Sequence, residues 1–181
     1  MVIVYKLVAT SILAILNTTG HGDPSKVKPI AVLQGHDTLI EYPMVRMIQD
    51  QKTWGQLWTL HKGISGIPGA SGGIVNADSS PTPVVDFGEN EVLIVFGGHN
   101  ANVQAYDYVK TDVRGKTAVI QITPSMFGTA ALEVDMTPYI IMVLPREKVE
   151  ISVELDTVAR DGSHSWNQIA KFAAPKTAPK K

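Results

Sequence analysis

The residues that come closest to a catalytic motif surround Ser71, in the segment Gly69-Ala-Ser71-Gly-Gly73. This segment matches G-x-S-x-G, the turn that presents the nucleophilic serine of many hydrolases. That chemistry needs a strand entering the turn and a helix leaving it, because these elements fix the hydroxyl and its oxyanion donors. Neither flank of Ser71 has the periodicity of a strand or a helix. We therefore interpret the segment as a loop and keep a serine hydrolase that uses Ser71 as a remote alternative.

The spacing of metal ligands is also missing from the sequence. The five histidines are each more than four residues from the next, and the chain has no cysteine. The HExxH and CxxC spacings that bind zinc are therefore absent. No glycine-rich phosphate loop connects a strand to a helix. We predict no metal site and no cofactor, and we expect that the protein is not an enzyme.

The best candidate for a recognition site is the polar segment 97–102, which follows an apolar stretch. Its glycines give backbone freedom, and its side chains donate and accept hydrogen bonds. The candidate partner-binding residues are Gly98, His99, Asn100, Asn102 and Tyr106. One alternative is a hairpin turn built from residues that tolerate left-handed backbone conformations. For Tyr106, the alternative is a half-buried tyrosine on the next strand.

Length and composition indicate one folded domain. The chain has 181 residues, of which 44% are hydrophobic and 18% charged, which is too apolar for a disordered protein. A chain of this length buries roughly two thirds of its unfolded surface without a disulfide or a metal. Sixteen Lys and Arg against seventeen Asp and Glu give a net charge of −1. This balance provides no bulk attraction to nucleic acid, so we expect no nucleic-acid partner.

The first twenty residues differ from the rest of the chain. Met1–Leu16 is apolar with one charge, Lys6, and small residues follow at Thr18 and Gly20. This pattern predicts a secretory signal peptide over residues 1–20. One alternative is a retained membrane anchor, since sixteen residues approach the roughly 17 that span a bilayer. Another is a buried N-terminal strand. The first two predict an extracytoplasmic location (periplasmic, cell-surface or secreted), and the anchor adds membrane contact through residues 1–16.

Between residues 29 and 172, apolar and polar residues alternate in the way that is typical of half-buried strands. Two continuously apolar stretches, 92–96 and 139–144, predict central strands covered on both faces. The dipeptide Asp161-Gly162 predicts a tight turn between the last two strands, which then form a terminal hairpin. The expected strands are 30–33, 45–48, 92–96, 103–109, 117–123, 132–136, 139–144, 149–159 and 165–172.

One helix is predicted over residues 50–62, with Asp50 placed to cap it. Its apolar face follows the spacing i, i+3, i+4 and i+7 with Trp54, Leu57, Trp58 and His61. Two indoles on one face are large enough to cover a sheet. We expect His61 to act as a positive charge at the C-terminal end of the helix rather than as a ligand.

These elements predict the α+β class. We expect a mostly antiparallel sheet of about nine strands with one principal amphipathic helix, in a single domain over residues 29–172. The remaining residues, 173–181, form a basic Pro/Ala/Lys tail that we expect to be extended.

The order of two motifs carries a family resemblance. The helix contains Trp54-Gly-Gln-Leu57-Trp58, and Pro83-Val-Val-Asp86-Phe87 precedes the apolar strand that ends at Gly97. In this order and spacing, residues 45–145 resemble the PrcB-type protease-complex accessory domain family. The resemblance implies an exported bacterial protein without catalytic residues, which associates with a secreted protease and stabilises it.

We expect the motif residues to be structural: Trp54, Leu57, Trp58, Pro83, Asp86 and Phe87. The tryptophans would pack the helix on the sheet, and Asp86 would fix the loop that precedes Phe87. The expected function is that of a non-enzymatic, extracytoplasmic, protein-binding accessory subunit that supports a larger assembly. Its partner would be another protein, such as an exported protease or a membrane complex. The alternative is a structural subunit of a filament or membrane complex, held by its N-terminal segment, in which the edge of the terminal hairpin pairs with a neighbour.

Overall fold

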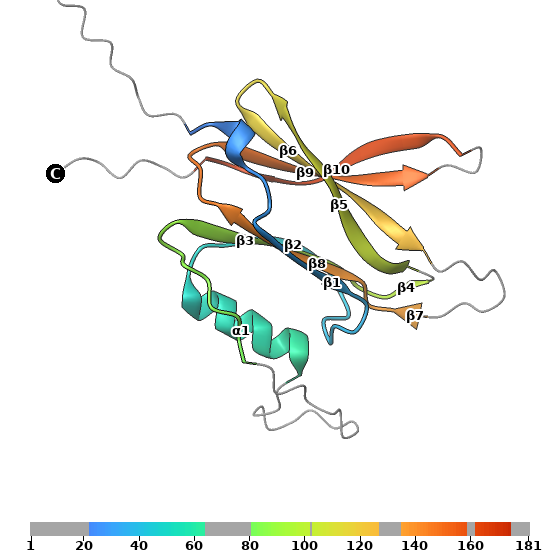
Figure 1. The fold of residues 1–181 in the computed structure, drawn as a ribbon. Coiled ribbons are helices and arrows are strands. Elements are labelled where there is room, and N and C mark those ends of the chain that lie inside the picture. The colour runs from blue at the N-terminus through green and yellow to red at the C-terminus, as the bar shows by residue number, and fades with distance from the viewer. Residues whose placement is uncertain (1–21, 64–80, 102, 127–134, 159–161, 175–181) are drawn as a thin grey trace, which may run out of the picture.

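Strands make up most of the structure and form two stacked sheets, with a helix outside the first sheet (Figure 1). The computed structural model describes residues 22–63, 81–101, 103–126, 135–158 and 162–174, and the statements below concern these residues.

The first sheet has four antiparallel strands in the order β1-β8-β3-β2. They span Ala31–Gly35 (β1), Tyr139–Pro145 (β8), Asn90–Gly97 (β3) and Pro43–Ile48 (β2). The strands β3 and β8 contain the two continuously apolar stretches of the sequence and are neighbours at the centre of the sheet. The prediction that these stretches form central strands covered on both faces is confirmed.

The second sheet has the order β10-β9-β6-β5. Its strands span Val103–Arg114 (β5), Thr117–Met126 (β6), Glu150–Val158 (β9) and His164–Phe172 (β10). The strands β9 and β10 form the expected antiparallel terminal hairpin, but β9 runs parallel to β6. The other described elements are β4 (Asn100–Ala101) and β7 (Asp135–Met136), which pair with each other, and the short 3-10 helix η1 (Pro24–Lys26).

The described residues are mostly β with a single helix, which fits the predicted α+β class. The strands do not form one sheet, however, but two sheets of four strands and a two-stranded ribbon. Apolar alternation identifies a strand and its buried face, but it does not say which strands become neighbours. Of the expected strand 132–136, only Asp135–Met136 lies within the described residues.

A continuous apolar core fills the space between the two sheets. The first sheet contributes residues such as Leu93 of β3 and Ile140 of β8, and the second contributes Ile120 of β6 and Ile151 of β9. The alternate positions of β3, such as Val92, point away from this core and pack against the helix. The two central strands therefore bury apolar side chains on both faces, which holds all three layers together.

The helix α1 (Gln51–Lys62) covers the outer face of the first sheet (Figure 1). As predicted, Asp50 caps it, because Asp50 Oδ1 accepts a hydrogen bond of 2.8 Å from the Thr53 amide. The predicted apolar face is also confirmed, with Trp54, Leu57, Trp58 and His61 all buried. Within the described ranges, no helix has the length and the apolar character that crossing a membrane requires.

The two sequence motifs are in direct contact. Trp54 Nε1 donates a hydrogen bond of 2.9 Å to the Pro83 carbonyl, and Phe87 packs against the apolar residues beneath the helix. The side chain of Asp86 binds the segment that follows Phe87 rather than the loop that precedes it, because Asp86 Oδ1 accepts a hydrogen bond of 2.9 Å from the Gly88 amide. The expected role of Asp86 is therefore corrected: it fixes the turn that leads into β3.

Two glycines of the helical segment provide an opposed pair of stability tests. A Cβ added at Gly55 meets no atom within 4 Å, so Gly55→Ala should raise the free energy of unfolding by about 1 kcal/mol through helix propensity. Gly63 has φ 66°, and a Cβ there would overlap Leu39 Cδ1, so Gly63→Ala should lower it by roughly 1–2 kcal/mol. Urea unfolding of both variants measures the two changes. Equal effects in the two variants would contradict this account of the helix.

Candidate partner-binding site

The predicted recognition loop connects β3 to β4 and is attached to the start of β2. Gly98 has a left-handed backbone with φ 66°, and a Cβ there would lie 2.8 Å from Pro43 Cδ, so the position requires glycine. The His99 amide donates to the Glu41 carbonyl at 3.3 Å, and His99 Nε2 lies 3.6 Å from Glu41 Oε2. The loop therefore presents an exposed His99 on a turn with a defined backbone.

The other predicted site residues have different positions. Asn100 is half-buried and donates from Nδ2 to the Gly97 carbonyl at 3.4 Å. Tyr106 is only 4% exposed, more deeply buried than either expectation, and its hydroxyl fills the space where a Cβ of Gly97 would lie. Burial raises the pKa of the Tyr106 hydroxyl. Asn102 lies outside the described residues.

A hollow of about 480 Å³ borders this loop, on the open side of the two sheets between β2 and β10. We call it the larger hollow. Gly97 and Asn100 line the part next to the loop, and Tyr106 contributes to its wall. The remaining lining is apolar: Pro43, Met44, Val45, Val95, Phe96, Leu155, Ile169 and Ala170.

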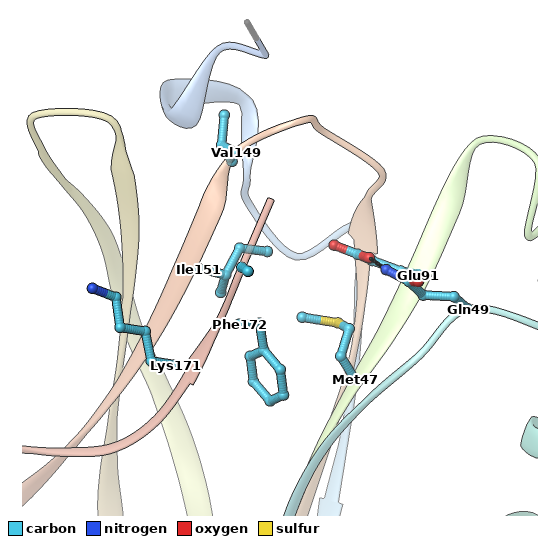
Figure 2. A pocket seen from close by; sticks show the side chains of 8 residues that line it. Met47, Gln49, Glu91, Val149, Ile151, Lys171 and Phe172 are labelled. Atoms are coloured by element: carbon cyan, nitrogen blue, oxygen red, sulfur yellow. Dashed lines mark hydrogen bonds between the residues drawn. The ribbon is translucent and has the colours of Figure 1, made fainter. Parts of the chain in front are cut away.

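A second hollow, of about 300 Å³, follows further along β2 and β10 (Figure 2). We call it the smaller hollow. Met47 of β2 and Phe172 of β10 approach it from the two sheets, together with Val149 and Ile151. Its polar groups are Gln49 and Glu91, as well as Lys171. Figure 2 shows the Lys171 side chain directed away from Glu91, and its Nζ lies 3.0 Å from Glu150 Oε1.

Glu91 is the buried acid of the smaller hollow, with 2% of its surface exposed. Its Oε2 accepts a hydrogen bond of 2.8 Å from Gln49 Nε2. Burial raises the pKa of the Glu91 carboxyl, although the Gln49 hydrogen bond and the charge of Arg146 both oppose the increase. Among the described residues, Glu91 has no ion pair. The carboxyl that borders this hollow is therefore bound by a neutral amide rather than by a cation.

Both hollows lie between strand edges that are not paired within the described residues. The strand β2 pairs with β3 alone, and β10 pairs with β9 alone. We call the two hollows and the facing edges of β2 and β10 the β2–β10 cleft. Sequence reasoning missed this cleft, because its lining comes from strands that are far apart in the chain. The sequence does show apolar side chains on β2 and β10, which are the edge strands that border the cleft.

The expected strand 149–159 does not have the exposed polar face that is typical of a half-buried strand. Glu154 and Asp156 of β9 are almost fully buried there. Burial raises the pKa of the Glu154 carboxyl, but the hydrogen bonds that Arg114 and Gln121 donate to it, together with the positive charge of Arg114, bring this pKa below its ordinary value. His164 Nδ1 lies 2.7 Å from Asp156 Oδ2. Long polar side chains of neighbouring strands therefore cover these carboxylates, which the alternating pattern does not reveal.

His61 also differs from its expectation. It is fully buried among aromatic rings, with ring centroids 4.5 Å from Tyr139, 5.3 Å from Trp58 and 5.7 Å from Phe96. Burial lowers the pKa of His61 to about 4, and the neighbouring Lys62 contributes to the decrease. The expected positive charge at the helix end is therefore wrong at neutral pH, where His61 is an uncharged packing residue.

No group of three or more His, Asp and Glu residues in the described part of the chain is placed to hold a metal ion. Ser71 lies outside the described residues. Comparisons of the chain with models of protein families, with curated proteins and with solved structures found no match. The resemblance to the PrcB-type family therefore stays a prediction.

Burial of neutral His61 makes stability depend on pH. Its pKa is about 4 in the folded state, against the ordinary histidine value of 6.5, so the unfolded chain binds the proton more readily. The stabilisation is complete above about pH 6.5 and is lost as the pH falls towards the folded-state pKa, by about 3 kcal/mol in total. Protonation of this group should make the free energy of unfolding, measured with urea, lower at about pH 5 than at about pH 7 by about 2 kcal/mol. The control is His61→Phe, which should have the shallower pH dependence; identical slopes would contradict the assignment.

Proposed function

We propose that this chain is a non-enzymatic, extracytoplasmic accessory subunit that binds another protein and supports a larger assembly. The observation that carries the proposal is the β2–β10 cleft, where two hollows lie between unpaired strand edges. Apolar hollows favour the insertion of side chains, and unpaired edges offer backbone hydrogen bonds. A polypeptide is the ligand that uses both features at once.

The lining of the cleft supports binding rather than catalysis. Neither hollow is lined by a serine, threonine or histidine among the described residues, so a serine or threonine nucleophile with a histidine base is not assembled there. The polar groups present are amides, a tyrosine hydroxyl, Glu91 and Lys171. Such groups orient a bound chain, while the apolar walls supply the contact area.

The location and the partner follow from the sequence. The signal-like residues 1–20 support export, and we take residues 29–172 as one domain. The resemblance to the PrcB-type family favours a bacterial source and an exported protease or membrane complex as the partner. The contact between Trp54 and Pro83 agrees with the structural role that the resemblance gives to both motifs.

Substitution in the cleft should abolish partner binding. Ile169 is partly buried and lines the larger hollow, so Ile169→Asp would place a charge among apolar contacts. Val84 is 96% exposed and lies outside the cleft, so Val84→Asp is the matched control. In affinity capture from the source organism, the wild type and the control should each retain one stoichiometric partner. The amount of this partner captured by Ile169→Asp should be lower by about tenfold or more. Thermal unfolding verifies that both variants fold. A wild-type chain that is always recovered alone would contradict the proposal.

A structural subunit is the second candidate, and the edge strand β1 favours it. Ile30 beside this strand is 62% exposed, and Val32 and Leu33 on it are also exposed. The described part of β1 has no bulge and pairs with β8 alone. An apolar edge of this kind can extend a sheet into a neighbouring subunit.

The mature N-terminus distinguishes the two candidates. Intact-mass spectrometry of the protein from its native source should show a chain that begins near His21 if the signal prediction is correct. Such a chain has lost Lys6 and with it one positive charge. A mature chain that still contains residues 1–20 would favour the structural subunit held by its N-terminal segment.

A further inference from the structure

We propose that the β2–β10 cleft binds an extended strand of the partner that carries a lysine or arginine, whose charged group pairs with Glu91 in the smaller hollow. An apolar side chain of the same strand fills the larger hollow. This inference rests on the proposed function and names the chemistry that the partner must offer.

The spacing of the hollows fits an extended strand. Val45 of β2 lines the larger hollow, whereas Met47 of β2 and Gln49, just after its end, line the smaller one. These are alternate positions, which in an extended chain lie on one face and about 7 Å apart. A partner strand beside β2 has the same repeat, so its alternate side chains reach the two hollows in turn.

The β2 edge is better suited than the β10 edge to pair with such a strand. The register between β2 and β3 is unbroken from Pro43 to Ile48. The register of β10 shifts between Gln168 and Ala170, which is a bulge or irregularity that disturbs regular pairing. The partner strand therefore extends the first sheet, and β10 forms the opposite wall of the cleft.

Charge complementarity specifies the residue in the smaller hollow. Glu91 is only 2% exposed, and the hydrogen bond to its Oε2 comes from the neutral amide of Gln49. The nearby cations have other contacts, because Arg146 Nη1 donates to the Phe87 carbonyl at 2.8 Å and Lys171 pairs with Glu150. A cation that enters the cleft would supply the ion pair that Glu91 lacks among the described residues.

The walls of the smaller hollow match the rest of a basic side chain. Met47, Val149, Ile151 and Phe172 are apolar and line the approach to Glu91. Lysine and arginine combine an apolar stem with a charged end, so the stem contacts these walls while the end reaches the carboxylate. An acidic side chain would be repelled by Glu91, and a purely apolar one would leave the acid without an ion pair.

Selection from a displayed library of random peptides of about ten residues tests this inference on the full chain. Peptides selected on the wild type should carry Lys or Arg with an apolar residue two or four positions away. Peptides selected on Glu91→Gln, which keeps the size of the side chain, should lose the basic preference and keep the apolar one. A selected peptide should bind the variant about tenfold more weakly than the wild type, and its Lys→norleucine form should bind both equally. Thermal unfolding confirms that the variant folds.

Three results would overturn the inference: no selected peptides, peptides without a basic residue, or the same peptides from both proteins. Concentration-dependent association of the purified chain that Glu91→Gln abolishes would also overturn it, since the occupant would then be a second copy. Capture of the native partner separates this inference from the proposed function. A partner retained equally by the wild type and by Glu91→Gln refutes the basic side chain alone, whereas a chain without a partner refutes the proposed function.

Discussion

Burial of β3 and β8 on both faces is the constraint on which the rest of the structure depends. Val92 and Ile94 face the helix, while Leu93 and Ile140 face the second sheet. Without either outer layer, one face of these two strands would be exposed to water, at a cost proportional to its apolar area. The helix with its two tryptophans and the sheet of β5, β6, β9 and β10 are therefore complementary covers for the same pair of strands. Packing against these two strands accounts for the apolar residues of both covers.

The same stacking creates the cleft. On one side of the two sheets, Gln34 of β1 donates a hydrogen bond of 2.6 Å to Asp107 of β5, which bridges the layers. On the other side, the facing edges of β2 and β10 leave two hollows between them. A stack of two open sheets always has such sides, and what differs here is their lining. The apolar walls and the buried Glu91 distinguish this side, and the proposed binding of a partner strand rests on them.

Local features of the fold could be predicted from the sequence, and the assembly of the layers could not. The Asp50 cap, the helical face of Trp54 and Trp58, and the central position of residues 92–96 follow from periodicity and capping chemistry, and all are confirmed. The division into two sheets depends on pairings between distant strands, such as β6 with β9, which periodicity does not encode. The site shows the same limit, since its polar loop is visible in the sequence but the burial of Glu91 is not. His61 has the position of an end-of-helix charge in the sequence, and only the aromatic rings packed around it show that it is neutral.

The path of the chain through the layers has a kinetic consequence. It passes from the first sheet (β1 to β3) to the second (β5 and β6), returns to the first for β8, and ends in the second with β9 and β10. Neither layer is complete until the last quarter of the polypeptide is available, because β8 lies at the centre of one layer and β9 at the centre of the other. Folds dominated by such distant pairings form slowly, since chain closure precedes the contacts that reward it. A newly made chain of this design therefore cannot complete either sheet until β8 and β9 have been synthesised.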